Sequence, residues 1–181
     1  MRHYLWSFAI ANYISFFFWL ALPAAPPWYL RAHGCAIDLA TAPSPAGLLR
    51  VDEYLATSYF RDFYSRAASV FGALPSMHCA YPLLGLLTAW RSATVRTLPL
   101  HILYTVVMFS ASVYFDHHWI VDGLFGWAVA VVAVLAARKL LERWPELSSA
   151  RAVPAGEAVR EHPAGEPQRS GVPVAAPPKV L

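Results

Sequence analysis

The stretch Tyr114-Phe-Asp-His-His-Trp-Ile-Val-Asp122 joins two long apolar segments, yet it contains two histidines and two aspartates. His118 and Asp122 are four residues apart, so on a helix they share one face and come within hydrogen-bonding reach. A carboxylate that holds one imidazole nitrogen fixes the tautomer and leaves the other nitrogen nucleophilic. Because ionisable groups are costly at a membrane boundary, they are commonly functional there. The stretch predicts a reactive histidine, although an interfacial His/Trp belt that ends a helix is an open alternative.

The composition indicates a membrane protein. The chain has 181 residues, of which 57% are hydrophobic and 14% charged, and its mean hydropathy is +0.42. These values are typical of polytopic membrane proteins rather than soluble domains. The net charge is only +3 and the basic residues are scattered, so we expect no nucleic-acid partner. Cys35 and Cys79 lack the spacing of a metal site and are expected to be free thiols, with a disulfide left open.

Four apolar segments are predicted to be membrane-spanning helices. They cover residues 4–22, 79–90, 97–115 and 119–140. The first reaches across the roughly 30 Å hydrocarbon core and is long enough to stay as an anchor; Pro23 ends it. Gly123 and Gly126 give the last segment a small-residue face for close helix packing. We therefore expect an all-α polytopic membrane helix bundle with four transmembrane helices, as one domain over residues 1–144.

The two remaining parts of the chain differ in character. Residues 23–77 form a long loop in which residues 47–68 mix charges with apolar residues at helical spacing. We expect an amphipathic helix at the membrane surface there, with a solvated loop as the alternative. Residues 145–181 are rich in Pro, Ala, Gly, Glu and Arg without periodicity, which predicts a disordered tail.

The order of the segments places two histidines together. With four alternating spans, His78 starts the second segment and His118 the fourth, so both lie at one membrane face. Basic residues favour the cytoplasmic side, and the opposite ends carry Arg2, Arg91, Arg96, Arg138, Lys139 and Arg143. We therefore expect an extracytoplasmic site, in an inner or plasma membrane, and a cytoplasmic tail.

Ser76 and His78 suggest an anion site. Ser76 is a favourable N-cap, and the preceding Pro75 discourages an earlier helix start. His78 then lies in the first turn, beside free backbone N–H groups at the positive end of the helix dipole. Such an end is well suited to bind phosphate.

Together these motifs resemble those of a known family. Leu74-Pro-Ser-Met-His78 and His118-Trp-Ile-Val-Asp122 are similar to motifs of the type-2 phosphatidic acid phosphatase superfamily. More narrowly, Phe71-Gly-Ala-Leu-Pro-Ser-Met-His78 and His117-His118-Trp-Ile-Val-Asp122 resemble the branch that contains inositol phosphoceramide synthases. The resemblance covers residues 22–140.

The resemblance implies a membrane enzyme that cleaves a lipid phosphate ester, as a phosphatase or as a phosphotransferase, inositol-phosphate transfer included. His118 would attack phosphorus and form a phosphohistidine, and Asp122 would orient it. His78 would protonate the departing alkoxide and then activate the acceptor. Ser76 and the N–H groups after it would hold phosphate oxygens. No metal or other cofactor is implied; the expected partners are the lipid phosphate and the membrane, with the oligomeric state left open.

The chain departs from the family pattern in three places. Ala111 and Ser112 stand where a Ser-Arg pair is common, and residues 25–31 lack the usual lysine followed by Arg-Pro. Members commonly have six spans, so we expect this chain to lack the first two helices of the family fold. As replacements for the lost cations, the candidates are Arg31, Arg61 and Arg66.

Two other functions stay open at this point. His78, His118 and Asp122, with or without His117, have the chemistry of a zinc site and would suit a metal-dependent hydrolase. Alternatively, the chain is a non-catalytic membrane scaffold in which these residues are interfacial anchors. His117 itself is expected to face away from Asp122, and Asp116 is expected to be a turn residue.

Overall fold

The computed structural model describes residues 1–67, 69–90 and 92–147. Within these residues the regular elements are helical, which confirms the predicted all-α class. The α-helices are α1 (Arg2–Ala21), α2 (Pro27–His33), α3 (Leu49–Leu55), α4 (Tyr59–Tyr64), α5 (Met77–Ala89), α6 (Leu98–Tyr114) and α7 (Ile120–Arg143). Short 3₁₀ turns occupy Ala46–Leu48 and Pro145–Leu147.

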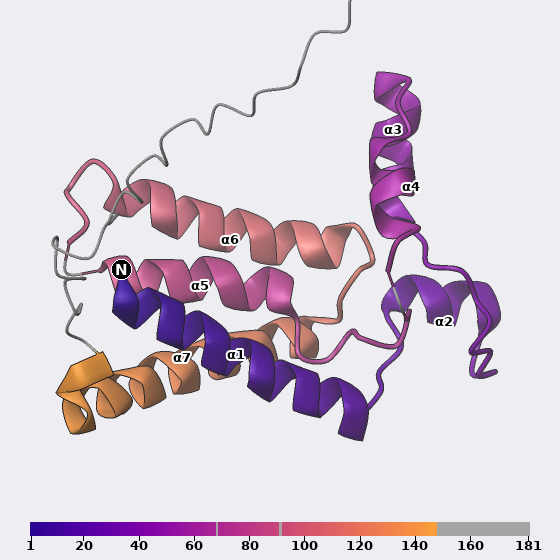
Figure 1. The fold of residues 1–181 in the computed structure, drawn as a ribbon. Coiled ribbons are helices and arrows are strands. Elements are labelled where there is room, and N and C mark those ends of the chain that lie inside the picture. The colour runs from indigo at the N-terminus through magenta and orange to yellow at the C-terminus, as the bar shows by residue number, and fades with distance from the viewer. Residues whose placement is uncertain (68, 91, 148–181) are drawn as a thin grey trace, which may run out of the picture. The chain divides into compact units, whose positions relative to one another are not determined.

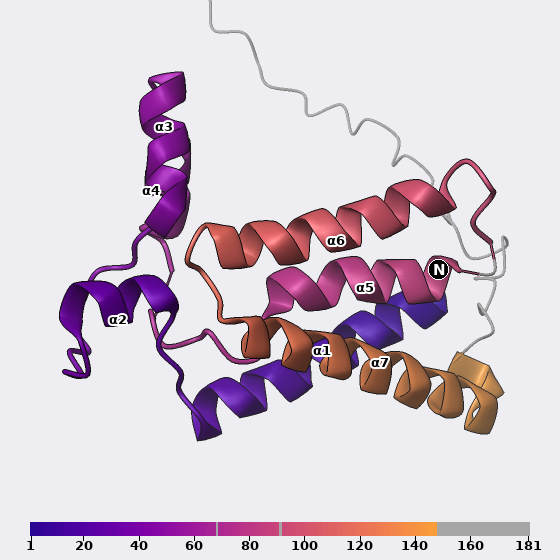
Figure 2. The same ribbon diagram turned by 180° about the vertical axis from the view of Figure 1, so that it is seen from behind.

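The four longest helices form a bundle. Figures 1 and 2 show α1, α5, α6 and α7 side by side, and α5 contacts the other three. Its buried side chains meet those of α1 and α7 in a core made largely of small and aliphatic residues: Ala11, Met77, Ala80, Leu84, Val129, Ala130 and Ala133. The outward faces carry exposed aromatic and aliphatic side chains, such as Phe16 and Val107. An apolar exterior of this kind suits a lipid environment.

The glycines of α7 allow this packing. A Cβ at Gly126 would overlap the backbone carbonyl of Ser76 at the start of α5, and one at Gly123 would overlap the ring of Phe109 on α6. The predicted small-residue face is therefore confirmed, and it holds α7 against the end of α5 that carries His78.

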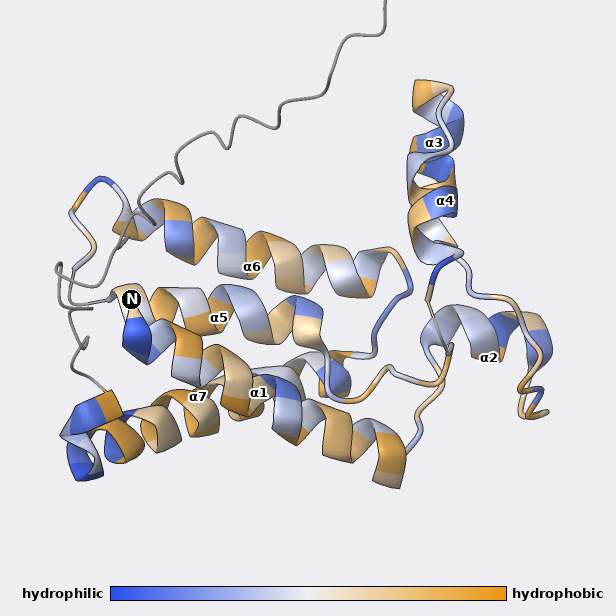
Figure 3. Ribbon diagram, in the orientation of Figure 1, coloured by the Kyte–Doolittle hydropathy of each residue, from blue (hydrophilic) through white to orange (hydrophobic). Residues whose placement is uncertain are grey.

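Two of the helices, α1 and α7, are long and apolar enough to cross a membrane. The helices α5 and α6 are shorter, with 13 and 17 residues. Figure 3 shows hydrophobic residues along α7, whereas α3 and α4 mix hydrophilic and hydrophobic residues. Residues 145–147, at the start of the predicted disordered tail, form a 3₁₀ turn. The rest of that tail, residues 148–181, lies outside the described residues. Arg91 lies outside them as well.

The prediction of a single amphipathic helix over residues 47–68 is wrong. The structure instead has α3 and α4, separated at Ala56, whose φ of 50° is left-handed. The cause is Asp52. Its buried carboxylate accepts hydrogen bonds from the Thr57 hydroxyl and from the backbone N–H groups of Phe60 and Arg61 in the first turn of α4. Burial alone would raise the pKa of Asp52, but these hydrogen bonds outweigh it and hold the pKa below the usual value. A side chain from α3 thus caps α4, which breaks the continuous helix.

The close approach at Gly126 generates a prediction about stability. Gly126→Ala is expected to lower the midpoint of thermal unfolding of the full chain in detergent, because the added methyl group forces α5 and α7 apart. Such overpacking costs about 1–3 kcal/mol. Gly85→Ala on α5 is the matched control, since nothing lies within 4 Å of a Cβ there. Its midpoint should match or exceed that of the wild type; equal losses in both variants would contradict the packing described.

Candidate active site

The two predicted histidines are in contact. His78 lies in the first turn of α5, and His118 lies in the loop between α6 and α7. The Nδ1 atom of His78 is 2.9 Å from Nε2 of His118, and their ring centroids are 5.1 Å apart. The prediction that the start of α5 and the start of α7 lie at one end of the bundle is therefore confirmed.

A backbone carbonyl fixes the tautomer of His118. Its Nδ1 atom is 2.9 Å from the carbonyl oxygen of Ala73. Since a carbonyl oxygen can only accept a hydrogen bond, Nδ1 carries the proton and is the donor. In the neutral ring Nε2 is then unprotonated, so it accepts the hydrogen bond from Nδ1–H of His78. The site thus contains a proton donor that already touches the lone pair of a second imidazole.

The surroundings keep His118 uncharged. Burial, with the nearby His78 ring as a second cause, lowers its pKa from 6.5 to about 3, although the hydrogen bond to Ala73 acts in the opposite direction. A neutral imidazole with a free lone pair is the nucleophilic form. The carbonyl of Ala73 is itself held, because the N–H of Ala73 donates to the oxygen of Ala24 at 3.1 Å.

The predicted hydrogen bond between His118 and Asp122 is not formed. Oδ2 of Asp122 lies 3.9 Å from Nδ1 of His118 and instead accepts the backbone N–H of Trp119 at 2.8 Å. The reason is that α7 begins at Ile120, so His118 precedes the helix and the four-residue helical spacing does not apply. Asp122 caps α7, and Ala73 occupies the position expected for the carboxylate.

Ser76 caps α5 as predicted, with its Oγ accepting the N–H of Cys79 at 3.4 Å. Its own N–H donates to the backbone oxygen of Asp122 at 3.0 Å, which ties the two helix starts together. The residue is fully buried and is absent from the described lining of the cavity beside the histidines. Contact of its hydroxyl with phosphate therefore stays a prediction.

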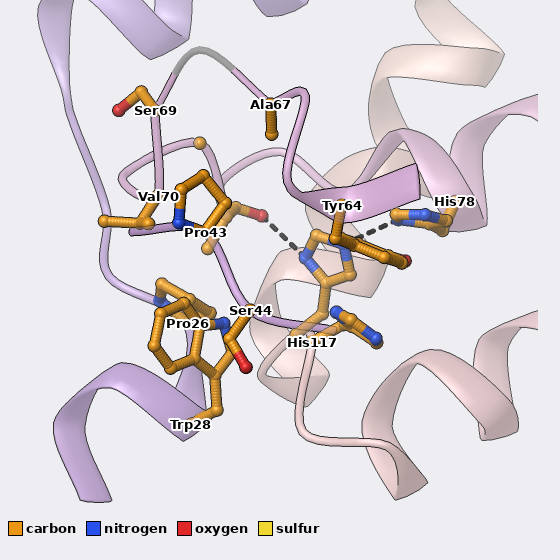
Figure 4. A pocket seen from close by; sticks show the side chains of 13 residues that line it. Pro26, Trp28, Pro43, Ser44, Tyr64, Ala67, Ser69, Val70, His78 and His117 are labelled. Atoms are coloured by element: carbon orange, nitrogen blue, oxygen red, sulfur yellow. Dashed lines mark hydrogen bonds between the residues drawn. The ribbon is translucent and has the colours of Figure 1, made fainter. Parts of the chain in front are cut away.

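A cavity of about 190 Å³ opens beside the histidine pair. Figure 4 shows Tyr64, His78 and His117 on one side of it and an apolar wall on the other, formed by Pro26, Trp28, Pro43 and Val70. His117 stacks on Tyr64 with ring centroids 4.7 Å apart. The sequence indicated His117 only as an optional ligand of a zinc site, and it gave no signal for Tyr64, because this residue ends α4 in a segment that carries no motif.

The loop that carries the histidines is tied to the segment after α1. Arg31 of α2 donates to both carboxylate oxygens of Asp116 at 2.7 Å. The backbone oxygen of Asp116, which adopts a φ of 63°, accepts the N–H of Trp28 at 3.2 Å. The indole of Trp119 donates to the oxygen of Ala25 at 3.2 Å. Asp116 is therefore a turn residue, as predicted, and also an anchor for α2.

The cavity holds little positive charge. Of the predicted replacement cations, Arg31 is paired with Asp116, and neither Arg61 nor Arg66 is among the lining residues. Within the described residues, no group of three or more His, Cys, Asp or Glu side chains is disposed to hold a metal ion. Cys35 and Cys79 are both free thiols.

Comparison with known proteins identifies relatives. A family model described as the PAP2 superfamily matches residues 1–136. Phosphoinositol dihydroceramide synthase of Bacteroides thetaiotaomicron is 35% identical over 137 residues, or 71% of this chain and 42% of that protein. The catalytic subunit of inositol phosphorylceramide synthase of Schizosaccharomyces pombe is 30% identical over 146 residues, or 80% of this chain and 34% of that protein. This chain thus spans less than half the length of these curated relatives. No solved structure matches it.

The uncharged His118 predicts how stability depends on pH. Because its pKa is about 3 in the folded chain against the usual 6.5, the unfolded chain binds more protons between these two values. The part of the free energy of unfolding that depends on the neutral ring is fully present above pH 6.5 and decreases as the pH falls toward 3. At about pH 5 the loss should reach about 2 kcal/mol.

This loss is measurable as the difference in thermal midpoint between about pH 7.5 and about pH 5. The wild type should lose more than His118→Asn, which cannot titrate. His101→Asn, at the far end of α6, is the matched control and should behave like the wild type. Equal losses in the wild type and in His118→Asn would contradict a buried neutral imidazole at this position.

Proposed function

The chain belongs to the PAP2 superfamily, and from that premise we propose that it is an integral membrane lipid phosphotransferase that works through a phosphohistidine on His118. One observation carries the proposal: Nδ1 of His78 lies 2.9 Å from Nε2 of His118, whose other nitrogen is held by a carbonyl. A proton donor and a nucleophile therefore meet beside a cavity. This is the minimum machinery for displacing an alkoxide from phosphorus.

In the first half of the reaction Nε2 of His118 attacks phosphorus. The substrate phosphate has to displace the hydrogen bond between the two rings to reach it. The bond from phosphorus to the alkoxide oxygen breaks as the bond from phosphorus to Nε2 forms. His78 enters this step as the imidazolium, having taken a second proton from solvent; its Nδ1–H proton passes to the departing oxygen, which leaves as an alcohol, and His78 becomes neutral. In the second half His78 takes the proton of an incoming hydroxyl, whose oxygen attacks phosphorus and releases His118.

The protonated His78 and a helix end stabilise the phosphate in this scheme. The described lining of the cavity contains no Lys or Arg side chain. His78 stands in the first turn of α5, where the unpaired backbone N–H groups and the positive end of the helix dipole favour an anion. Proton transfer from His78 neutralises charge on the departing oxygen as it develops. The carbonyl of Ala73 holds the Nδ1–H as His118 becomes cationic on phosphorylation.

The names of the relatives indicate a substrate class. Two are an inositol phosphorylceramide synthase subunit and a phosphoinositol dihydroceramide synthase. We therefore assign this chain the transfer of phosphoinositol from a phospholipid to a ceramide-like alcohol. Hydrolysis would result if water took the place of that alcohol.

The bundle of four helices supports a proposal for the arrangement in the membrane. We assign α1, α5, α6 and α7 to four membrane passages, with the histidine end extracytoplasmic and the tail after α7 cytoplasmic. A helix of 13 residues such as α5 is about 20 Å long and shorter than the hydrocarbon core. The site at its start would then lie below the headgroup level. The exposed rings of Tyr54, Tyr59 and Phe63 suit a position of α3 and α4 on the membrane surface.

A panel of labelled lipids tests this function. Membranes containing the wild-type chain should convert phosphatidylinositol plus ceramide to labelled phosphoinositol ceramide faster than they release label from phosphatidate or diacylglycerol pyrophosphate. His118→Ala should lower that rate about 10³-fold or more, because the nucleophile is lost. His101→Ala, the matched control, should keep it. Unchanged activity in His118→Ala would contradict the mechanism.

The acid function of His78 is tested with two leaving groups. His78→Gln should slow transfer from a natural phosphodiester about 10²- to 10⁴-fold, because its alkoxide leaves only with a proton. A phosphodiester whose leaving group is para-nitrophenolate needs no proton, so the variant should lose far less of that activity. The measurement is the ratio of the two rates in the wild type and in the variant. Equal losses on both substrates would show that His78 does not act as the acid.

A further inference from the structure

A second cavity, of about 550 Å³, lies against the end of α1. Its described lining residues come from the end of α1 and from the segment before α5: Phe16, Trp19, Leu20, Pro23, Ser69, Phe71 and Gly72. None of these residues carries a charge, and most are aromatic or aliphatic. The volume is typical of cavities that hold a small ligand. We call this the apolar cavity, and the one beside His78 and His118 the histidine cavity.

Residues 69–73 form a wall that the two cavities share, and we call them the crossing segment. Ser69 and Gly72 line both cavities. Phe71 lines the apolar cavity, whereas the preceding Val70 lines the histidine cavity, as Figure 4 shows. This is the pattern of extended backbone, in which neighbouring side chains point to opposite sides. The two cavities are therefore adjacent along the crossing segment.

The crossing segment is held firmly in place. The N–H of Ala24, just after α1, donates to the oxygen of Phe71 at 3.0 Å, and the N–H of Ala73 donates to the oxygen of Ala24 at 3.1 Å. The carbonyl of Ala73 in turn accepts the hydrogen bond from Nδ1 of His118. A ligand that lies across this segment is thus placed by the same backbone that orients the imidazole.

Gly72 leaves open space in the shared wall. Nothing lies within 4 Å of a Cβ built at this position, and its φ is outside the left-handed region. Neither packing nor backbone conformation therefore demands a glycine here. A glycine in an extended segment also serves where a ligand approaches the backbone closely.

We propose that the apolar cavity holds a hydrocarbon chain of the lipid whose phosphate occupies the histidine cavity, and that this lipid crosses the wall at Gly72. The inference rests on the proposed function, because a lipid phosphate ester joins the two chemistries that the cavities separate. The side chains of Phe16 and Leu20 are exposed, so a chain can enter from the surrounding hydrocarbon. In a membrane such a chain gains little from leaving lipid tails that are equally apolar. The role of the cavity is to position phosphorus against His118.

Photochemical cross-linking tests where the chain lies, without turnover. The full protein in vesicles of phosphatidylcholine is irradiated with phosphatidylinositol that carries a diazirine within one acyl chain, and the labelled peptides are mapped by mass spectrometry. Peptides covering residues 16–23 and 69–72 should be labelled. A phosphatidylcholine with the same diazirine should label them about fivefold less, the factor expected from one lost hydrogen bond to the headgroup. Equal labelling by both probes would indicate ordinary lipid contact and overturn the inference.

Gly72→Leu tests the crossing point. The added side chain meets open space, so the variant should fold, yet it obstructs the path between the cavities. Labelling of residues 16–23 should fall, and transfer from phosphatidylinositol should fall about 10²-fold more than the reaction of the para-nitrophenyl ester of inositol phosphate, which has no chain to position. Gly85→Leu on α5, where a Cβ also meets open space, is the matched control and should keep the labelling and the ratio of the two rates.

A second variant fills the apolar cavity itself. Leu20→Trp should lower the labelling of residues 69–72, whereas Leu100→Trp, at an exposed position of α6, should not. Unchanged labelling in folded Gly72→Leu and Leu20→Trp would overturn the inference, as would equal losses on both substrates in Gly72→Leu. A chain that is labelled as expected but transfers no phosphoinositol would refute the proposed function alone.

Discussion

The geometry of the site depends on the hydrogen bond from Nδ1 of His118 to the carbonyl of Ala73. That bond decides which nitrogen of His118 is free, and therefore which nitrogen can meet His78. The carbonyl is rigid because the backbone around it pairs with Ala24, just after α1. On the other side, the loop bearing His118 is fastened by Arg31 and Asp116. The bundle thus brings the helix starts together, while the segment after α1 sets the orientation of the imidazole.

The placement of a carbonyl where a carboxylate was expected has an electrostatic consequence. A carboxylate in contact with Nδ1 would favour the charged form of His118, whereas a neutral carbonyl in a buried site leaves desolvation dominant. His118, the proposed nucleophile, is consequently neutral. Asp122 stays 3.9 Å away, where in the proposed reaction its negative charge would stabilise the cation that forms when Nε2 bonds to phosphorus. Its hydrogen bond to Trp119 meanwhile sets where α7 begins.

The sequence predicted those features that depend on long or repeated patterns. The apolar lengths of α1 and α7 identified these two helices, and Gly123 and Gly126 identified the close packing of α7, which is against α6 and the start of α5. The alternation of segments placed His78 beside His118. Features that depend on one residue at an element boundary were not predictable. The start of α7 at Ile120 removed His118 from the helix and broke its expected bond to Asp122.

Two other features lay outside the reach of sequence patterns. The periodicity of residues 47–68 favours one helix, and only the fold shows that Asp52 turns back to cap α4. Tyr64 and His117 are far apart in the chain, and neither belongs to a periodic pattern that would pair them. Their contact, at 4.7 Å, depends on where α4 ends. Hydropathy patterns indicate the length of a helix and which of its faces is apolar. They do not indicate how a loop folds back over the end of a helix.

In the proposed reaction Nε2 of His118 becomes covalently bonded to phosphorus. The most direct measurement is rapid alkaline quenching of the full chain during turnover of phosphatidylinositol labelled with ³²P, followed by peptide mapping by mass spectrometry. We expect an acid-labile, alkali-stable phosphoinositol adduct on the peptide containing His118, which disappears when ceramide is added. Transfer that proceeds with no labelled chain, or an adduct on His78 or His117 instead, would contradict it.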